Sequence, residues 1–345
     1  MTVTHPGAPT PTLTAALDCF FVRPGDDERA RTTDRHVLGR VTYGHGGRPP
    51  LLHDGAPLVR IAMGGDSSER ITEVWTTDRP VRSGREGALV YAEDGEHLFC
   101  AVRIDERGVY RDTVRSVYEK AFTLMWRLGY TELLRMWNMV GAITEANADG
   151  LENYRDFCMG RAEAFEAWSG RVDGMPAATG IGSLRPGIDL YFLACHTGRT
   201  RHLENPRQTP AHQYPTRYGP KSPSFARATV MDPASGARSA LYVSGTASII
   251  GDDTVHHDDI ERQCDVTLAN IEALISPENL RRHGLTGGFG LADLDCVKVY
   301  VRDTEHLPAV RARCAEAFRP GADLAFFNVD VCRSDLLVEI EGICR

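Results

Sequence analysis

The chain has 345 residues, 42% of them hydrophobic and 25% charged, which is typical of a soluble globular protein and excludes a fibrous or disordered chain. Its length predicts about two domains, each large enough to bury its own core. The formal net charge of −8 disfavours a nucleic-acid partner, because nucleic-acid-binding proteins owe much of their affinity to basic side chains that neutralise phosphates.

Cysteine usage and the absence of long apolar runs indicate the compartment. The nine cysteines include no C-x-x-C pair, which favours reduced thiols over a disulfide framework or a zinc site. No run approaches the roughly 18 apolar residues of a membrane span, and residues 1–7 do not resemble a signal peptide. We therefore expect a cytoplasmic protein without a membrane partner. Residues 1–14, rich in Thr and Pro, are predicted to be a disordered arm.

Hydrophobic periodicity predicts the same supersecondary unit twice. The first copy is expected to contain strands near residues 97–102, 134–140 and 188–195, with helices at 112–128 and 151–168. The second is expected to contain strands near 241–245, 296–301, 326–331 and 336–343, with helices at 259–275 and 307–318. Helix N-caps are predicted at Asp112 or Thr113 and at Asp258 or Asp259.

This pattern predicts an α+β fold with two domains, each a mixed sheet with helices on one face, packed together as a pseudo-oligomer. We expect an N-terminal domain with extra strands over residues 15–205 and a C-terminal catalytic domain over 225–345. Residues 206–224 between them form a basic, Pro-rich stretch, which we interpret as a solvated linker. The open faces of the two sheets must be covered by each other or by a third element, so a site is expected between the copies.

Only the second copy ends in a strand with paired acids. Strand side chains alternate between faces, so Glu339 and Glu341 share one face, while Val338 and Ile340 share the other. A carboxylate covered by another layer loses solvation, which raises its pKa towards the range useful for proton transfer. The strand at 336–343 is therefore the place where we expect chemistry.

The first copy offers a cation instead. Tyr154 and Arg161 lie seven residues apart, so they project from the same helical face as Cys158 and Phe165. A guanidinium on an apolar stripe either has an anionic partner or extends to water, and the sequence leaves both interpretations open.

Two other motifs are weaker. Residues 256–259 (HHDD) suggest a metal site, but consecutive residues before a helix favour a loop and an N-cap, and we expect no metal. Residues 179–182 (TGIG) lack the G-K-[ST] ending of a phosphate loop, so we expect them to let the backbone approach a ligand or the other domain closely.

Two resemblances add to this interpretation. Residues 297–303 (VKVYVRD) and 338–342 (VEIEG) resemble the YjgF-like reactive-intermediate deaminase fold, although residues 320–328 lack the arginine with which those deaminases bind a substrate carboxylate. A longer resemblance, to the chorismatases, rests on residues 154–162 (YRDFCMGRA), 176–182 (PAATGIG), 214–220 (YPTRYGP), 225–229 (FARAT) and 335–342 (DLLVEIEG).

The chorismatase resemblance implies two YjgF-like (chorismate mutase-like) domains and a metal-free, cofactor-free site between them that converts chorismate into pyruvate and a benzoate-type product. It implies substrate-binding roles for Tyr154, Arg161, Tyr214 and Arg227 and a catalytic acid/base role for Glu339. Chorismate carries two carboxylates, and planar guanidinium groups suit such partners.

Two further positions concern the product. Gly245 in 242–248 (YVSGTAS) and Cys332 in 329–333 (VDVCR) are similar to the branch of the family that forms 3-hydroxybenzoate, whereas the hydrolytic branch has Ala at the first position. A glycine leaves room that a methyl group would fill, so the bound ring can sit differently relative to Glu339, and a thiol beside the ring could relay a proton. Without the family, Gly245 fits a strand-end bulge and Cys332 a small core residue.

The expected function is that of a chorismate-cleaving lyase that forms 3-hydroxybenzoate and pyruvate, with Glu339, Cys332 and Gly245 at the reaction centre. The alternatives are a hydrolytic chorismatase that yields a dihydroxycyclohexadiene carboxylate, and a non-catalytic YjgF-like ligand-binding protein. A duplicated chain can replace the contacts that single-domain relatives make on oligomerisation, so we expect a monomer.

Overall fold

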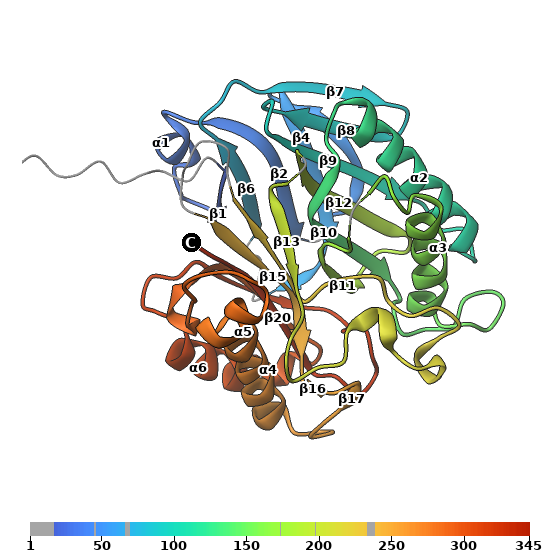
Figure 1. Ribbon diagram of the computed structural model, residues 1–345, viewed down its shortest axis with the longest axis vertical. Helices are drawn as coiled ribbons and strands as arrows, with labels where there is room; N and C mark the ends of the chain where they lie inside the picture. Colours follow the sequence, from blue (N-terminus) through green and yellow to red (C-terminus); the bar gives the residue numbers. More distant parts are fainter. Residues whose placement is uncertain (1–16, 45, 66–69, 173, 197, 233–238) are drawn as a thin grey trace, which may run out of the picture.

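The computed structural model describes residues 17–44, 46–65, 70–172, 174–196, 198–232 and 239–345. The predicted arm at 1–14 lies outside these residues. Strands form the interior and long helices lie on the outside (Figure 1). Over the described residues, no helix is both long enough and apolar enough to cross a membrane.

The first predicted copy forms the middle sheet, of order β11-β10-β12-β9-β8-β7. Its strands are β7 (Arg82–Glu86), β8 (Leu89–Glu93), β9 (His97–Ile104), β10 (Glu132–Gly141), β11 (Ala177–Ser183) and β12 (Ile188–Cys195). Helices α2 (Arg111–Arg127) and α3 (Asn153–Ala167) cover its outer face (Figure 1). Strand β11 was missed from the sequence because its two glycines weaken the strand signal.

The second copy forms the C-terminal sheet, of order β13-β14-β15-β20-β18-β19-β5. Its strands are β5 (Gly64–Gly65), β13 (Thr200–Leu203), β14 (Ala228–Met231), β15 (Ala240–Ala247), β18 (Leu294–Val301), β19 (Leu324–Asn328) and β20 (Val338–Cys344). Helices α4 (Ile260–Ile275), α5 (Pro277–Arg282) and α6 (Leu307–Ala317) cover its outer face, and β16 (Ile249–Ile250) and β17 (Asp253–Thr254) form a separate hairpin (Figure 1).

The predicted repeat is confirmed by strand order. The run β11-β10-β12-β9 in one sheet corresponds to β19-β18-β20-β15 in the other, and the first pair of each run is parallel. The two helix caps differ. Asp259 caps α4 as predicted, accepting a hydrogen bond from Arg262 N at 3.1 Å. The prediction for α2 was wrong, because Tyr110 is its N-cap residue and the carboxylate of Asp156, from α3, accepts from the first backbone amides.

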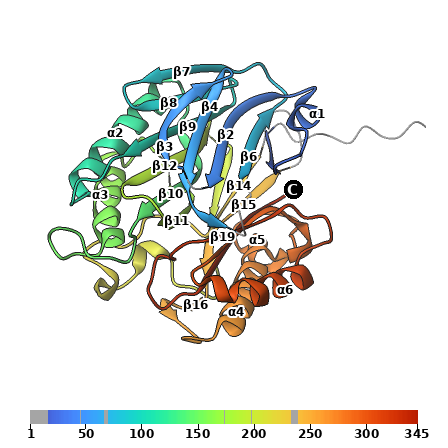
Figure 2. The same ribbon diagram turned by 180° about the vertical axis from the view of Figure 1, so that it is seen from behind.

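The extra strands form a third, N-terminal sheet, which the sequence did not predict as a separate layer. It contains β1 (Leu17–Val22), β2 (His36–Gly44), β3 (Arg48–His53), β4 (Ala56–Ala62) and β6 (Ile71–Thr77), with the short helix α1 (Glu28–Thr32). Its run β4-β2-β6-β1, with β2 and β4 parallel, has the same order as the runs in the other two sheets. Figure 2 shows this sheet from behind, next to the other two.

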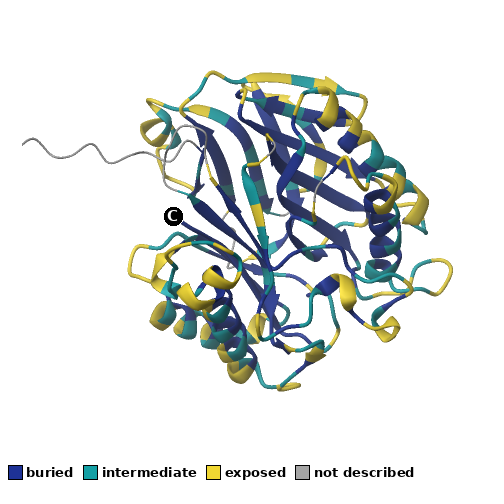
Figure 3. Cartoon of the chain, viewed as in Figure 1, coloured by how far each residue is buried: buried dark blue, intermediate teal, exposed yellow. Residues whose placement is uncertain are grey.

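The inner faces of the three sheets meet in one shared core. Trp75 of β6, Trp137 of β10 and Tyr242 of β15 come one from each sheet, with ring centroids 5.7 Å and 6.3 Å from that of Trp75. The N-terminal sheet thus supplies the cover that the open faces of the two copies require, and the buried strands at the centre of Figure 3 follow from this arrangement.

The predicted linker is not extended. It contains two 3-10 helices, η1 (Ala211–Gln213) and η2 (Thr216–Tyr218), and runs between α3 and the β16–β17 hairpin (Figure 1). Its charges are paired locally, since Arg217 contacts Asp252 and Asp253 at 2.6 Å and Lys221 contacts Glu166 at 2.6 Å. Strand β13 already belongs to the C-terminal sheet, and the domain boundaries stay a prediction.

Because all three sheets pack around Trp75, we expect its loss to destabilise the fold. Trp75→Ala should lower the free energy of unfolding by about 3–5 kcal/mol, because it leaves a cavity where all three sheets pack. Trp126→Ala is the matched control, since Trp126 on α2 is 45% exposed and its loss should change stability by about 0.5 kcal/mol or less. Equal urea midpoints for the two variants would contradict the shared core.

Candidate active site

A cavity lies between the first turn of α3 and the inner face of the C-terminal sheet. Its empty volume, including the open mouth, is about 830 Å³. The linker closes one side through Tyr214, Tyr218 and Pro223. Six of the seven predicted site residues line this cavity: Tyr154, Tyr214, Arg227, Gly245, Cys332 and Glu339.

Glu339 lies on the inner face of β20 and is only 4% exposed, as the alternation of side chains predicted. Its single hydrogen-bond donor among the described residues is the weak thiol of Cys332, with Sγ 3.9 Å from Oε2. Burial and the nearby charge of Glu341 raise the pKa of Glu339 to about 8, although Arg135 opposes the shift. The Glu339 carboxyl group is therefore a neutral acid at pH 7.

Gly245 packs directly against that carboxyl group. It lies at a register shift between β15 and β20, so the bulge expected of a strand-end glycine is present. A Cβ atom here would overlap Oε1 of Glu339 and lie 2.9 Å from its Cδ and 3.2 Å from Thr179 Oγ1. The sequence analysis expected a methyl group at this position to fill space beside a ligand ring. The structure shows that it would also displace the Glu339 carboxyl group.

Cys332 faces the cavity from the loop before β20. It is partly exposed, which disagrees with a small core residue. Burial and the charge of Glu339 raise the pKa of its thiol well above the ordinary value. Cys332 is therefore a protonated thiol next to Glu339, able to donate a weak hydrogen bond.

Arg227 and Tyr214 form one wall. Arg227 Nη2 donates to Tyr214 OH at 2.7 Å and to Thr209 O at 2.9 Å, while its Nε has no partner in the described part of the chain. One candidate anion is Glu204, but it forms no ion pair with Arg227. Burial raises the pKa of Glu204 to about 7, although the charge of Arg227 opposes this rise. The Arg227 guanidinium is 2% exposed and available for an anion.

Arg161 lies behind the cavity wall rather than on it. It is 4% exposed, so its side chain does not extend to water. Its guanidinium lies 5.2 Å and 5.7 Å from the rings of Phe165 and Tyr118, and Nη2 is 3.7 Å from Met136 Sδ. Within the described residues it forms no ion pair, and its Nε has no hydrogen-bond partner. Tyr154, in contrast, lines the cavity; burial raises the pKa of its hydroxyl, and the charge of Arg161 opposes this rise.

The sequence analysis missed four basic or aromatic residues of the wall, namely Arg155, Tyr218, Phe225 and Arg333. Arg333 stacks 3.8 Å above the ring of Tyr218 and donates to Asp252 O at 2.9 Å. Arg155 also lines the cavity, 3.6 Å from Glu152. Arg155 and Tyr218 lie inside the motifs that carry the family resemblance, and Arg333 directly follows Cys332. Their closeness in sequence to predicted site residues could therefore have identified them.

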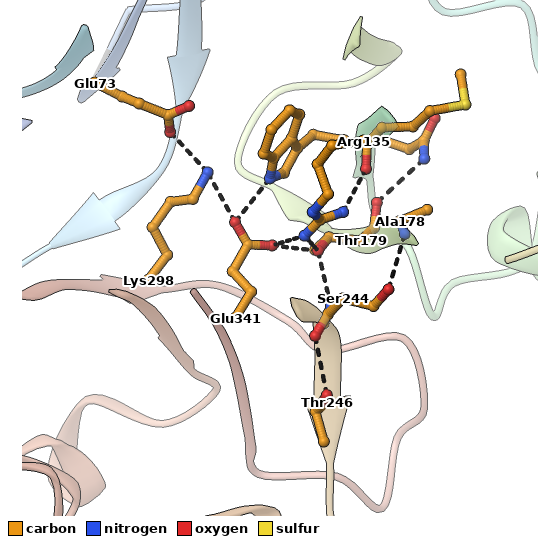
Figure 4. A network of polar contacts seen from close by, with 12 residues as sticks. Glu73, Arg135, Ala178, Thr179, Ser244, Thr246, Lys298 and Glu341 are labelled. Carbon is orange, nitrogen blue, oxygen red and sulfur yellow. Dashed lines mark hydrogen bonds and ion pairs between the residues drawn. The ribbon is translucent and has the colours of Figure 1, made fainter. Parts of the chain in front are cut away.

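A buried charge network adjoins Glu339 and was also missed (Figure 4). Glu341 forms ion pairs with Lys298 at 2.8 Å and Arg135 at 2.7 Å, and Lys298 pairs with Glu73 at 2.7 Å. Burial alone would raise the pKa of Glu341, but Lys298 and Arg135 outweigh it and lower that pKa. The signal was a cation inside an apolar strand pattern, at Arg135 in 133–137 (LLRMW) and Lys298 in 297–301 (VKVYV).

The residues at 179–182 have the expected role. Gly182 N donates to Asp330 O at 2.8 Å, so the middle sheet approaches the C-terminal part at backbone distance. A Cβ atom at Gly182 would lie 2.6 Å from Asp330 O, which explains the glycine. Thr179 joins the network around Glu341.

Comparison with known proteins agrees with this geometry. Residues 73–194 match the family model of the FkbO/Hyg5-like chorismatase N-terminal region. A 3-hydroxybenzoate synthase from Streptomyces hygroscopicus is 49% identical over 311 residues, which are 90% of this chain and 92% of that protein. A chorismatase from Streptomyces rapamycinicus is 42% identical over 334 residues, 97% of this chain and 99% of its own length.

The chain therefore belongs to the chorismatase family. A chorismatase crystal structure superposes with a TM-score of 0.90 at 44% identity, covering 96% of this chain and 98% of that one. A YjgF-family protein from Mycobacterium tuberculosis matches 35% of this chain and 85% of its own, at 25% identity and a TM-score of 0.24. The predicted α+β fold class is confirmed by the chorismatase structure and by the sheets and helices described above.

The raised pKa of Glu339 predicts how stability depends on pH. The folded state holds a proton that the unfolded state releases near pH 4.5, so wild-type stability falls as the pH rises from about 4.5 to about 8. Glu339→Gln removes this loss, and we expect the variant to exceed the wild type by a few kcal/mol at pH 9 and to match it at pH 5. Urea denaturation at both pH values measures this. A stability difference between the variant and the wild type that is the same at pH 5 and at pH 9 would show that Glu339 titrates normally.

Proposed function

We propose that this protein cleaves chorismate to 3-hydroxybenzoate and pyruvate, without a cofactor, by an intramolecular elimination in which Glu339 is the acid/base. The observation that carries the proposal is a buried, neutral carboxyl group in contact with Gly245 and Cys332, in a cavity bordered by cations. Family membership and the similarity to a 3-hydroxybenzoate synthase support it.

The buried arginines of the site favour a ligand with two carboxylates. Arg161 and Arg227 are buried guanidinium groups, and neither forms an ion pair within the part of the chain that the structure describes. Chorismate carries two carboxylates, and guanidinium groups bind carboxylates in bidentate, charge-assisted geometry. In the proposed complex Tyr214 and Arg227 on the cavity wall contact one carboxylate, whereas Arg161, which does not line the cavity, favours the dianion through its charge.

Binding of a dianionic ligand also helps to keep Glu339 protonated. In the free protein Arg227 and Arg135 favour the ionised form of Glu339. A ligand carboxylate that neutralises Arg227 weakens this influence, so the neutral carboxyl persists in the complex. Glu339 can then protonate the methylene carbon of the enol ether, which makes pyruvate a leaving group.

The steps after protonation involve only the substrate and the Glu339 carboxylate. The ring hydroxyl next to the ether attacks the carbon that carries the ether oxygen, the carbon–oxygen bond to pyruvate breaks, and the hydroxyl proton passes to the carboxylate of Glu339. The epoxide-like intermediate then opens and loses a ring proton to give 3-hydroxybenzoate. No water is consumed, and the protonated thiol of Cys332 supplies a weak donor beside Glu339.

The acidic chain, with its net charge of −8, is proposed to act on this small molecule and not on nucleic acid. We propose that it works as a monomer, because three sheets already close around one core within a single chain. We also propose that it works in the cytoplasm.

The direct test is incubation of the purified protein with chorismate alone, in isotopically labelled water. We expect pyruvate and 3-hydroxybenzoate in equal amounts, with no solvent oxygen in the ring product, and Glu339→Gln should fold normally and lose activity about 100-fold or more. A dihydroxycyclohexadiene carboxylate as the ring product, formed with net uptake of one water, would instead establish the hydrolytic branch. Ligand binding without pyruvate release would establish a non-catalytic protein.

The contact between Gly245 and Glu339 predicts a change of product. Gly245→Ala combined with Cys332→Ala should shift the product towards the dihydroxycyclohexadiene carboxylate, because the new methyl group displaces the Glu339 carboxyl and the thiol is lost. Chromatography of the products measures the ratio, with Cys332→Ala alone as the control. An unchanged ratio in the double variant would refute the steric explanation.

A further inference from the structure

The network around Glu341 crosses the three sheets, although no part of the proposed reaction uses it. Glu73 comes from the N-terminal sheet, Arg135 from the middle sheet, and Lys298 and Glu341 from the C-terminal sheet (Figure 4). All four residues are at most 3% exposed. Two cations and two anions balance one another, so an ionised Glu339 would add an uncompensated charge to the seam.

Glu341 is committed to the ionised form by its hydrogen bonds. Its Oε1 accepts from Trp137 Nε1 at 2.7 Å and is 2.8 Å from Lys298 Nζ. Its Oε2 accepts from Arg135 Nη2 at 2.7 Å and from the hydroxyl of Thr179. Four donors occupy the acceptor sites of one carboxylate, and a proton on either oxygen would displace one of them.

Glu339 is the opposite case on the same strand face. Only the thiol of Cys332 donates to it within the described residues. In the register of β18 and β20, Lys298 stands opposite Glu341, whereas the uncharged Tyr300 stands opposite Glu339. Two residues of a strand span about 7 Å, so the fixed charge of Glu341 lies within range of the second carboxyl group.

Thr179 ties the network to the reaction centre. Its hydroxyl donates to Glu341, and the same oxygen accepts from Arg135 Nη2 at 2.6 Å and from Gly245 N at 3.0 Å. Gly245 in turn packs against the Glu339 carboxyl. Glu341 therefore acts on Glu339 by its charge and also by fixing the backbone that borders it.

We propose that Glu341 is a positioning residue for the proposed reaction: a permanently ionised carboxylate, locked by Lys298, Arg135 and Thr179, that keeps Glu339 protonated and in place. The role in turnover rests on the proposed function of Glu339, whereas the effect on its protonation does not. The direction of the pKa shift of Glu339 agrees, with Glu341 the largest contribution after burial.

Other titratable or charged groups also face Glu339, and none replaces Glu341. They are Cys332 on the preceding loop, Tyr300 on β18, Tyr154 on α3, Arg135 on β10, Arg227 beside β14, and Glu152, Arg155, Arg333 and Asp335 on the cavity wall. Arg135 and Arg227 favour the ionised form, and the tyrosines and the thiol are neutral at pH 7.

The test is Glu341→Gln, measured by the ¹³C NMR titration of Glu339 in ligand-free protein labelled at the glutamate carboxyl carbons, with the signal assigned by its loss in Glu339→Gln. We expect the titration midpoint to fall by about one to two pH units, because a buried negative charge about 7 Å away is removed. The alkaline limb of kcat/KM for chorismate should move to lower pH by a similar amount. Glu341→Asp, which keeps the charge, should largely restore both.

Asp189→Asn is the matched control. Asp189 is a buried carboxylate paired with Arg103 at 2.7 Å and lies outside the cavity, so its loss should lower stability without moving either readout. Should Glu341→Gln fail to fold, Glu341→Gln with Lys298→Met leaves one cation and one anion in the network, which proteins tolerate better, and a smaller fall in the same direction is expected.

An unchanged titration midpoint overturns the proposal whatever happens to turnover. If the wild type does not convert chorismate, the proposed function fails, but the titration of the ligand-free protein still decides whether Glu341 controls Glu339.

Discussion

The ion pairs between Glu341 and its two cations are the interaction on which the rest of this structure depends. They join the middle and C-terminal sheets across a buried interface, and Lys298 extends the connection to Glu73 of the N-terminal sheet. Buried ion pairs contribute little net stability compared with apolar packing, but they define one arrangement of the elements that meet there. Here that arrangement leaves Glu339 beside a fixed anion with hardly any hydrogen-bond donor.

Duplication explains why the acid and its surroundings come from different copies. The three sheets share a strand order, but only the copies with long helices supply the cavity walls. The N-terminal sheet lacks those helices and packs its inner face into the common core. The interface between these related sheets is asymmetric, with Arg155 and Arg161 on α3 and the carboxyl pair on β20.

Much of this was predictable because it depends on local periodicity. Alternation along 336–343 predicted that Glu339 and Glu341 share a buried face, and helical spacing predicted α2, α3, α4 and α6. Strand β11 and the separate N-terminal sheet escaped prediction, because glycine-rich or short strands carry weak signals and pairing between sheets is non-local. Arg161 was predicted as a ligand, but only the three-dimensional packing shows that it does not line the cavity and that Arg135 pairs with Glu341.

The central claim is that two carboxyl groups on one strand face carry different protonation states at neutral pH. Neutron diffraction from a deuterium-exchanged crystal at pH 7 tests it most directly, since deuterium positions are observed rather than assigned. The account predicts deuterium on one oxygen of Glu339 and none on Glu341, with both Arg135 and Lys298 fully protonated. A Glu339 carboxylate without deuterium would contradict the account.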